Sequence, residues 1–192
     1  MLMGDDPFPP DCVVIEVHVE ELRQIFNSLD PTPFRQRDID PRAEEFIVGW
    51  ARDVPVGKPL GLRIHADREP VVPDAVATVR EAVREYFAER ADATRRRLRL
   101  LFRVGRTSLA IGLGFLAVSI VVGDLVESVL GETRFGGLAS ESLLIGGWVA
   151  MWRPLEIFLY EWWPIRAEAR LYDRLSAMTV RVVQPVNALD NG

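Results

Sequence analysis

The longest uninterrupted apolar stretch of the chain is Thr107–Gly123, which carries no charged side chain. A hydrocarbon core about 30 Å thick needs roughly 20 apolar residues in a helix, and the flanks of this stretch extend it to that length. A second apolar stretch, Leu138–Tyr160, is also long enough, although it contains Glu141, Arg153 and Glu156. The pattern predicts two transmembrane helices. For the second stretch, a half-inserted helix that turns along the membrane interface is the alternative.

Shorter segments alternate between apolar and polar residues, which is typical of a strand with one buried face. The clearest is Cys12–Val19, where β-branched apolar residues alternate with glutamate and histidine. Leu60–Ala66 and Thr179–Val183 show the same alternation. We therefore expect about three strands.

Apolar residues at spacings of three and four predict helices in the rest of the chain. A short helix follows the first strand from Leu22 to Leu29, and Asp40-Pro41 is typical of the start of a second helix. A much longer helix is predicted from a cap at Asp74 to about Glu127, roughly 80 Å at 1.5 Å per residue. An amphipathic helix is expected after Pro164.

Together these elements predict an α+β membrane protein, in which a long helix joins a two-helix transmembrane hairpin to a small cytoplasmic α/β head. The predicted segments are a disordered lead (1–11), the head (12–93 with 165–185), a basic collar (94–106), the hairpin (107–163) and a tail (186–192).

Charge gives this arrangement an orientation. Residues 1–93 have a net charge of −8, whereas residues 94–106 carry six arginines and no acid. Arginines beside a transmembrane helix mark its cytoplasmic side, and here they are expected to bind anionic lipid headgroups. They are Arg95, Arg96, Arg97, Arg99, Arg103 and Arg106.

The start of the chain has neither the basic nor the apolar region of a signal peptide. We therefore expect a multi-pass protein of the cell (inner) membrane with both termini in the cytoplasm, a layout typical of small bacterial membrane proteins. The acidic head argues against a nucleic-acid partner, because phosphate binding needs a positive surface.

Two groups of residues are candidate sites within the hairpin. Arg153 and Glu156 lie three residues apart, and such an intramembrane pair is either mutually neutralised or part of a functional path. A face of small residues predicts close packing between helices, within one chain or between chains. Its members are Ser108, Gly112, Ser119 and Gly123.

His18 and His65 share the outward face of the predicted sheet and could bind a divalent metal together with a carboxylate. Neither lies in a metal-binding motif, so a solvated polar face is the favoured interpretation, and no cofactor is expected. The sequence also lacks a phosphate-binding loop and a nucleophile elbow.

These observations favour a non-enzymatic scaffold, regulatory protein or complex subunit, whose acidic head binds a protein partner or itself as a homo-oligomer. The first alternative is an oligomeric pore or transport subunit, with Arg153, Glu156 and Glu161 along its path. The second alternative is a metal-dependent enzyme that uses His18 and His65.

Overall fold

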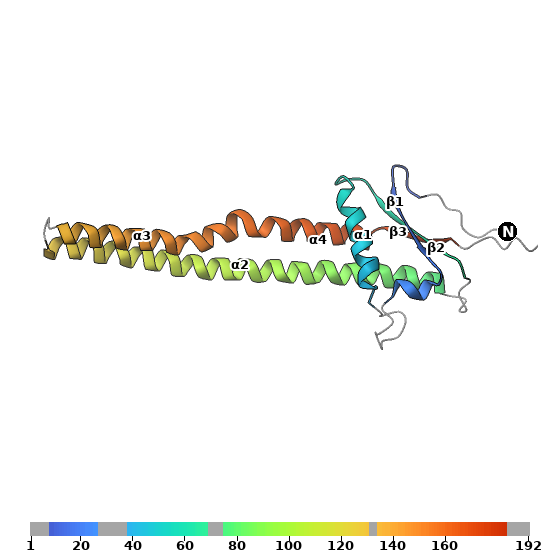
Figure 1. The fold of residues 1–192 in the computed structure, drawn as a ribbon, viewed down its shortest axis with the longest axis horizontal. Helices are drawn as coiled ribbons and strands as arrows, with labels where there is room; N and C mark the ends of the chain where they lie inside the picture. Colours follow the sequence, from blue (N-terminus) through green and yellow to red (C-terminus); the bar gives the residue numbers. More distant parts are fainter. Residues whose placement is uncertain (1–7, 27–37, 69–74, 131–133, 184–192) are drawn as a thin grey trace, which may run out of the picture. The chain divides into compact units, whose positions relative to one another are not determined.

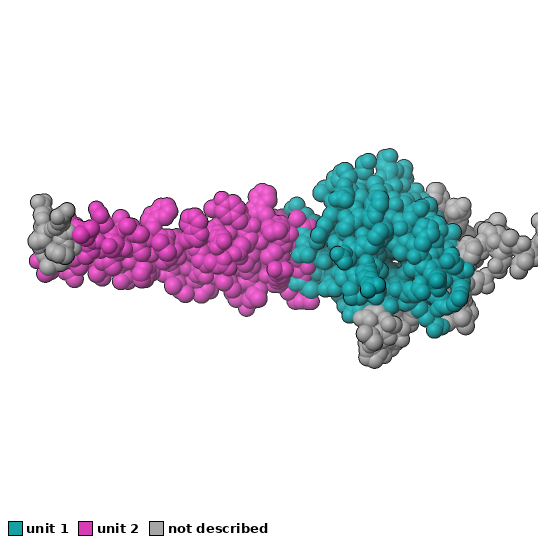
Figure 2. Space-filling view, in the orientation of Figure 1, with its two compact units in different colours: residues 1–93, 168–192 teal, residues 94–167 magenta. Residues whose placement is uncertain are grey.

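The computed structural model describes residues 8–26, 38–68, 75–130 and 134–183 (Figure 1). The protein combines helices with a small parallel sheet, and two helices are long and apolar enough to cross a membrane. It divides into two compact units, residues 1–93 with 168–192 and residues 94–167 (Figure 2). The predicted tail, the start of the predicted lead, the end of the short helix at Leu29 and the cap at Asp74 lie outside the described residues.

The sheet contains the three strands that the alternation predicted. They are β1 (Val13–Val19), β2 (Leu60–Ala66) and β3 (Thr179–Val183), in the order β1-β2-β3. Both pairings are parallel, and His18 lies opposite His65 in the register. Parallel neighbours require long crossover connections, and the connection between β2 and β3 is the whole helical hairpin.

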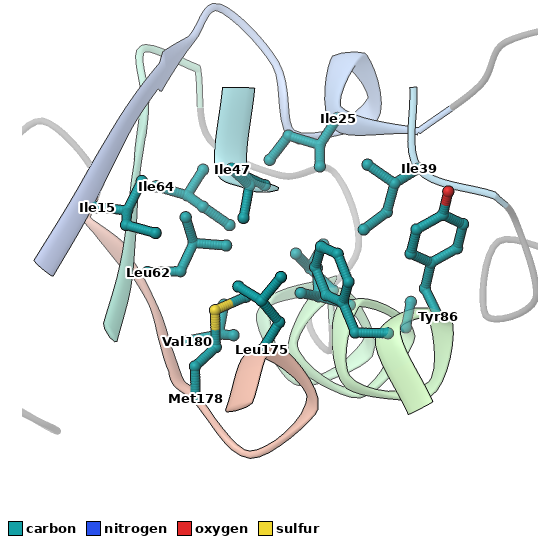
Figure 3. Close-up of a cluster of buried hydrophobic side chains, with 14 of the residues drawn as sticks. Ile15, Ile25, Ile39, Ile47, Leu62, Ile64, Tyr86, Leu175, Met178 and Val180 are labelled. Carbon is teal, nitrogen blue, oxygen red and sulfur yellow. The ribbon is translucent and has the colours of Figure 1, made fainter. Parts of the chain in front are cut away.

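One face of the sheet forms the core of the first unit (Figure 3). Each strand buries side chains on this face, for example Ile15 of β1, Leu62 of β2 and Val180 of β3. They belong to one apolar cluster with buried residues of the helices, among them Ile47, Val83, Phe87 and Leu175. Because the inward positions alternate along each strand, this burial fixes the register of the sheet.

Helix α1 (Pro41–Asp53) begins as its sequence predicted. The Asp40 side chain accepts a 2.9 Å hydrogen bond from the Arg42 N–H, and a proline occupies the first turn, where its missing N–H costs nothing. The helix predicted from Leu22 is shorter than expected. It is a 3-10 helix, η1 (Leu22–Ile25), and the chain then becomes extended because Phe26 forms a β-bridge with Ile39.

Helix α2 (Ala75–Leu130) is one continuous helix of 56 residues, as the sequence predicted. It is followed by α3 (Arg134–Glu156), a π-helical turn η3 (Ile157–Glu161) and α4 (Trp162–Ser176). The boundary predicted at Pro164 is wrong, since these three segments run on without a break. A proline removes one backbone N–H, and a local change to π geometry lets a helix continue past it. Pro164 lies directly after such a change, since η3 ends at Glu161. Within the same region the Trp162 indole N–H donates to the Phe158 carbonyl at 2.8 Å.

The apolar stretches of these helices are mostly exposed. Only 17% of the most apolar window of each helix is buried, whereas a core helix of a soluble protein would be largely covered. This exposure supports contact with lipid.

Candidate functional site

The small-residue face of α2 lies against α3 within the second unit. A Cβ added at Gly112 would lie 3.1 Å from the Ala150 carbonyl oxygen, and one at Gly123 would lie 3.1 Å from Ser140 Oγ. Ser119 is buried and Ser108 is half-buried. Gly112 and Gly123 therefore lie at a contact between helices of the same chain, and a Cβ added at Gly147 of α3 would lie 3.6 Å from Ser119 Cβ.

Two further glycines approach a neighbouring helix more closely, and neither was predicted from the sequence. A Cβ at Gly147 would lie 2.6 Å from Leu116 Cδ1, and one at Gly105 would lie 2.9 Å from Ile157 Cγ2. The Cβ added at Gly105 would contact the π-helical turn, because Ile157 is the first residue of η3. Gly105 lies seven residues before Gly112. A search at seven-residue spacing, which is the period of left-handed helix packing, could have found Gly105.

Arg153 is the centre of an ion-pair cluster at the end of α3. Its Nη1 donates to Glu156 Oε2 at 3.0 Å and also to Glu161 Oε1. Glu161 is the last residue of η3, so the second contact spans the π-helical turn. One guanidinium is therefore shared by two carboxylates of its own chain, and one negative charge of the three groups stays unbalanced.

All six collar arginines of α2 are exposed. At about 100° of rotation per residue, five of them project into a sector of roughly 100°, and Arg97 projects outside it. The buried residues Ala91, Thr94 and Gly105 occupy a different side of the helix. This arrangement places a concentrated positive face on α2 next to its apolar stretch.

The outer face of the sheet is polar. The rings of His18 and His65 stack with their centroids 4.4 Å apart and their planes 7° from parallel. Glu16 binds Arg63 at 2.6 Å, and His65 Nε2 lies 4.0 Å from Glu16 Oε2. These four side chains therefore lie together on the face that the alternation predicted.

The histidine pair does not have the geometry of a metal site. A metal ligand uses the lone pair in the plane of its ring, and in two stacked parallel rings those lone pairs do not converge on one ion. Among the described residues, no group of three or more histidine, cysteine, aspartate or glutamate side chains could hold a metal ion.

Phe8 lies over the same outer face. Its ring is 5.2 Å from the Arg63 guanidinium carbon and 4.7 Å from that of Arg181. A Cβ added at Gly61 would collide with the ring at 2.6 Å, so the glycine in β2 allows the phenyl group to rest on the strand. Burial raises the pKa of the neighbouring Cys12 thiol, which makes it a poorer nucleophile at neutral pH.

A half-buried cluster between α1 and α2 was not predicted. The Tyr86 hydroxyl donates to Glu44 Oε2 at 2.7 Å, and Arg90 Nη2 donates to the same oxygen at 2.8 Å. Burial, followed by the hydrogen bond to Glu44, raises the pKa of Tyr86 well above its usual value. The cluster fastens α1 to α2, and its partners are too far apart in sequence for periodicity to have indicated it.

The chain matches no known protein family, no curated protein and no solved structure.

Proposed function

We propose that this chain is a non-enzymatic docking protein, which its hairpin holds in the membrane while its head binds a cytoplasmic protein. The observation that carries this proposal is the uneven covering of the sheet. Parallel sheets are nearly always covered on both faces, yet the apolar core lies on one face here. The other face presents Glu16, His18 and Arg181 as exposed or half-buried side chains. Such a face is suited to a polar partner surface.

The two alternative functions have less support. A metal-dependent enzyme would need convergent ligands, whereas His18 and His65 are stacked. A pore would need polar groups that are free to meet an ion or solute, whereas Arg153 binds both Glu156 and Glu161.

The sheet also supports the proposed orientation. Since β2 precedes the hairpin and β3 follows it within the same sheet, the intervening chain begins and ends on one side of a membrane. Two crossings satisfy this condition. The exposed arginines of the collar and three arginines after the second apolar stretch then mark the cytoplasmic side. The three are Arg166, Arg170 and Arg174.

Cysteine labelling tests this orientation in a Cys12→Ser background. In intact cells an impermeant thiol reagent should label Arg134→Cys, at the start of α3 and between the two apolar stretches, and should leave Ala188→Cys unlabelled. Labelling of Ala188→Cys in sealed cells would contradict two crossings with both termini in the cytoplasm.

Photo-crosslinking tests the docking face in native membranes. A benzophenone amino acid at Arg181 should give a discrete crosslinked species, whereas the same group at exposed Arg84 on α2 serves as the matched control. The expected result is a strong adduct at Arg181 and little at Arg84. No adduct at Arg181, or equal adducts at both positions, would contradict docking through the sheet face.

A further inference from the structure

The two edges of the sheet are not equivalent. On the β3 edge, the Arg80 guanidinium of α2 donates to the Val180 carbonyl at 3.1 Å. An edge carbonyl that is already bonded to a side chain is unavailable to another strand. The helix therefore protects this edge of the sheet.

The β1 edge has no such protection from the described residues. Val13 N–H donates to the Pro59 carbonyl, and the Val19 carbonyl accepts from Asp67. Because backbone groups alternate in direction along a strand, the odd-numbered residues of β1 bond towards β2. The N–H and C=O groups of Val14, Glu16 and His18 then point away from the sheet, and no described residue supplies them with a partner.

Apolar side chains are also incompletely covered at this edge. Val17 and Val19 are half-buried, whereas Ile64 in the neighbouring strand is fully buried. A strand added beside β1 would extend the core over both valines. It would also enlarge an unusually small sheet, since four to six strands are typical.

The sequence of β1 is complementary to itself in one antiparallel register. With Val17 opposite Val17 of a second copy, Glu16 faces His18 of that copy on the outer surface. On the core surface, Ile15 faces Val19. A shift of the register by two residues places Glu16 opposite Glu16 of the second copy in one direction and opposite Glu20 of the second copy in the other. Like charges directly opposite one another destabilise a sheet, whereas opposite charges and branched apolar pairs stabilise it.

We propose that β1 pairs antiparallel with β1 of a second copy, with Val17 on the twofold axis, and joins two three-stranded sheets into one of six strands. This inference rests on the proposed docking function and names a second copy of the chain as a partner. The pairing satisfies the outward backbone groups of Glu16 and His18, which lie opposite each other, whereas Glu20, opposite Val14, already bonds to Gln24 and Arg68. It is isologous, so the assembly closes as a dimer.

A disulfide at the twofold axis tests the pairing. Val17 would occupy a non-hydrogen-bonded pair with Cα atoms about 4.5 Å apart, which is within the range that a disulfide spans. In the Cys12→Ser full-length protein, mild oxidation of membranes should convert most Val17→Cys chains to a dimer. Val182→Cys is the matched control, because Val182 is a half-buried valine on the protected edge strand. No Val17→Cys dimer, or an equal yield from Val182→Cys, would overturn the proposal.

A proline substitution provides the second measurement. Glu16→Pro removes an N–H that points outward and leaves the ladder between β1 and β2 intact. We expect light scattering in detergent to show a dimer for the unmodified protein and a monomer for Glu16→Pro, with unchanged circular dichroism. A monomeric unmodified protein would overturn self-pairing. A heterologous adduct at Arg181 would still support the docking function, so the two proposals can fail separately.

Discussion

Gly105 offers a sharp test of how the hairpin packs. A Cβ at this position would lie 2.9 Å from Ile157 Cγ2 and 3.2 Å from Phe158 Cζ. Ile157 is fully buried, and its β-branched side chain has few alternative rotamers. Overpacking of this kind costs about 1–3 kcal/mol, while exchanging glycine for alanine in a helix contributes about 1 kcal/mol of stability. Gly105→Ala should therefore be destabilised by about 0–2 kcal/mol.

Gly114 is the matched control, because a Cβ there would have no neighbour within 4 Å. Gly114→Ala should gain up to about 1 kcal/mol from helix propensity alone, so the two variants should differ by about 1–3 kcal/mol. Unfolding by titration with a denaturing detergent, followed by circular dichroism, measures this difference. Adding Ile157→Ala to Gly105→Ala should also cost less than Ile157→Ala costs alone. If Gly105→Ala were as stable as Gly114→Ala, the close approach of α2 to η3 would be refuted.

Three further predictions concern the ion-pair cluster, the tyrosine cluster and the third strand. Arg153→Leu and Glu156→Leu should each destabilise the protein, the double variant should be partly restored, and a double-mutant cycle should give a coupling of about 1–3 kcal/mol; additive effects would show that they do not pair. Arg153→Leu should cost more than Glu156→Leu, since Glu161 still binds the arginine when Glu156 is replaced. The pKa of Tyr86 is raised in the folded protein, so just above about pH 10 only the unfolded chain loses the tyrosine proton, and the stability of the fold should decrease with rising pH. Tyr86→Phe should reduce this decrease in thermal melts. An unchanged alkaline slope would contradict the raised pKa of Tyr86. Truncation after Trp163 removes the third strand and should sharply reduce accumulation of the protein on immunoblots, whereas normal yield and protease resistance would show that this strand is dispensable.

The sequence predicted the elements of the sheet better than its arrangement. Alternation located all three strands, because each has one face buried in the core. It could not indicate that they are parallel or that β2 is central, since these properties depend on where the connections return. The unequal protection of the edges depends on Arg80, which lies 100 residues from its acceptor.

For the hairpin, too, the sequence predicted some features and could not indicate others. Charge and hydropathy located both apolar stretches, and the spacing of Arg153 and Glu156 indicated their contact. Glu161 joins them only because the π-helical turn changes the rotation between residues 153 and 161. A boundary was expected at Pro164 because proline disfavours a helix interior, and the sequence pattern did not indicate the π-helical turn that precedes it.

The pairing of β2 with β3 has a consequence for the order of events during synthesis. Between Ala66 and Thr179 the ribosome must add residues 67–178. At about 5–20 residues per second, roughly 6–20 seconds pass before the last strand emerges. Until then one edge of β2 has no neighbouring strand, and the core lacks the side chains of Leu175, Met178 and Val180. The first unit can therefore complete its sheet only after all of residues 94–167 have been synthesised, so its folding marks a chain whose helical hairpin is already finished.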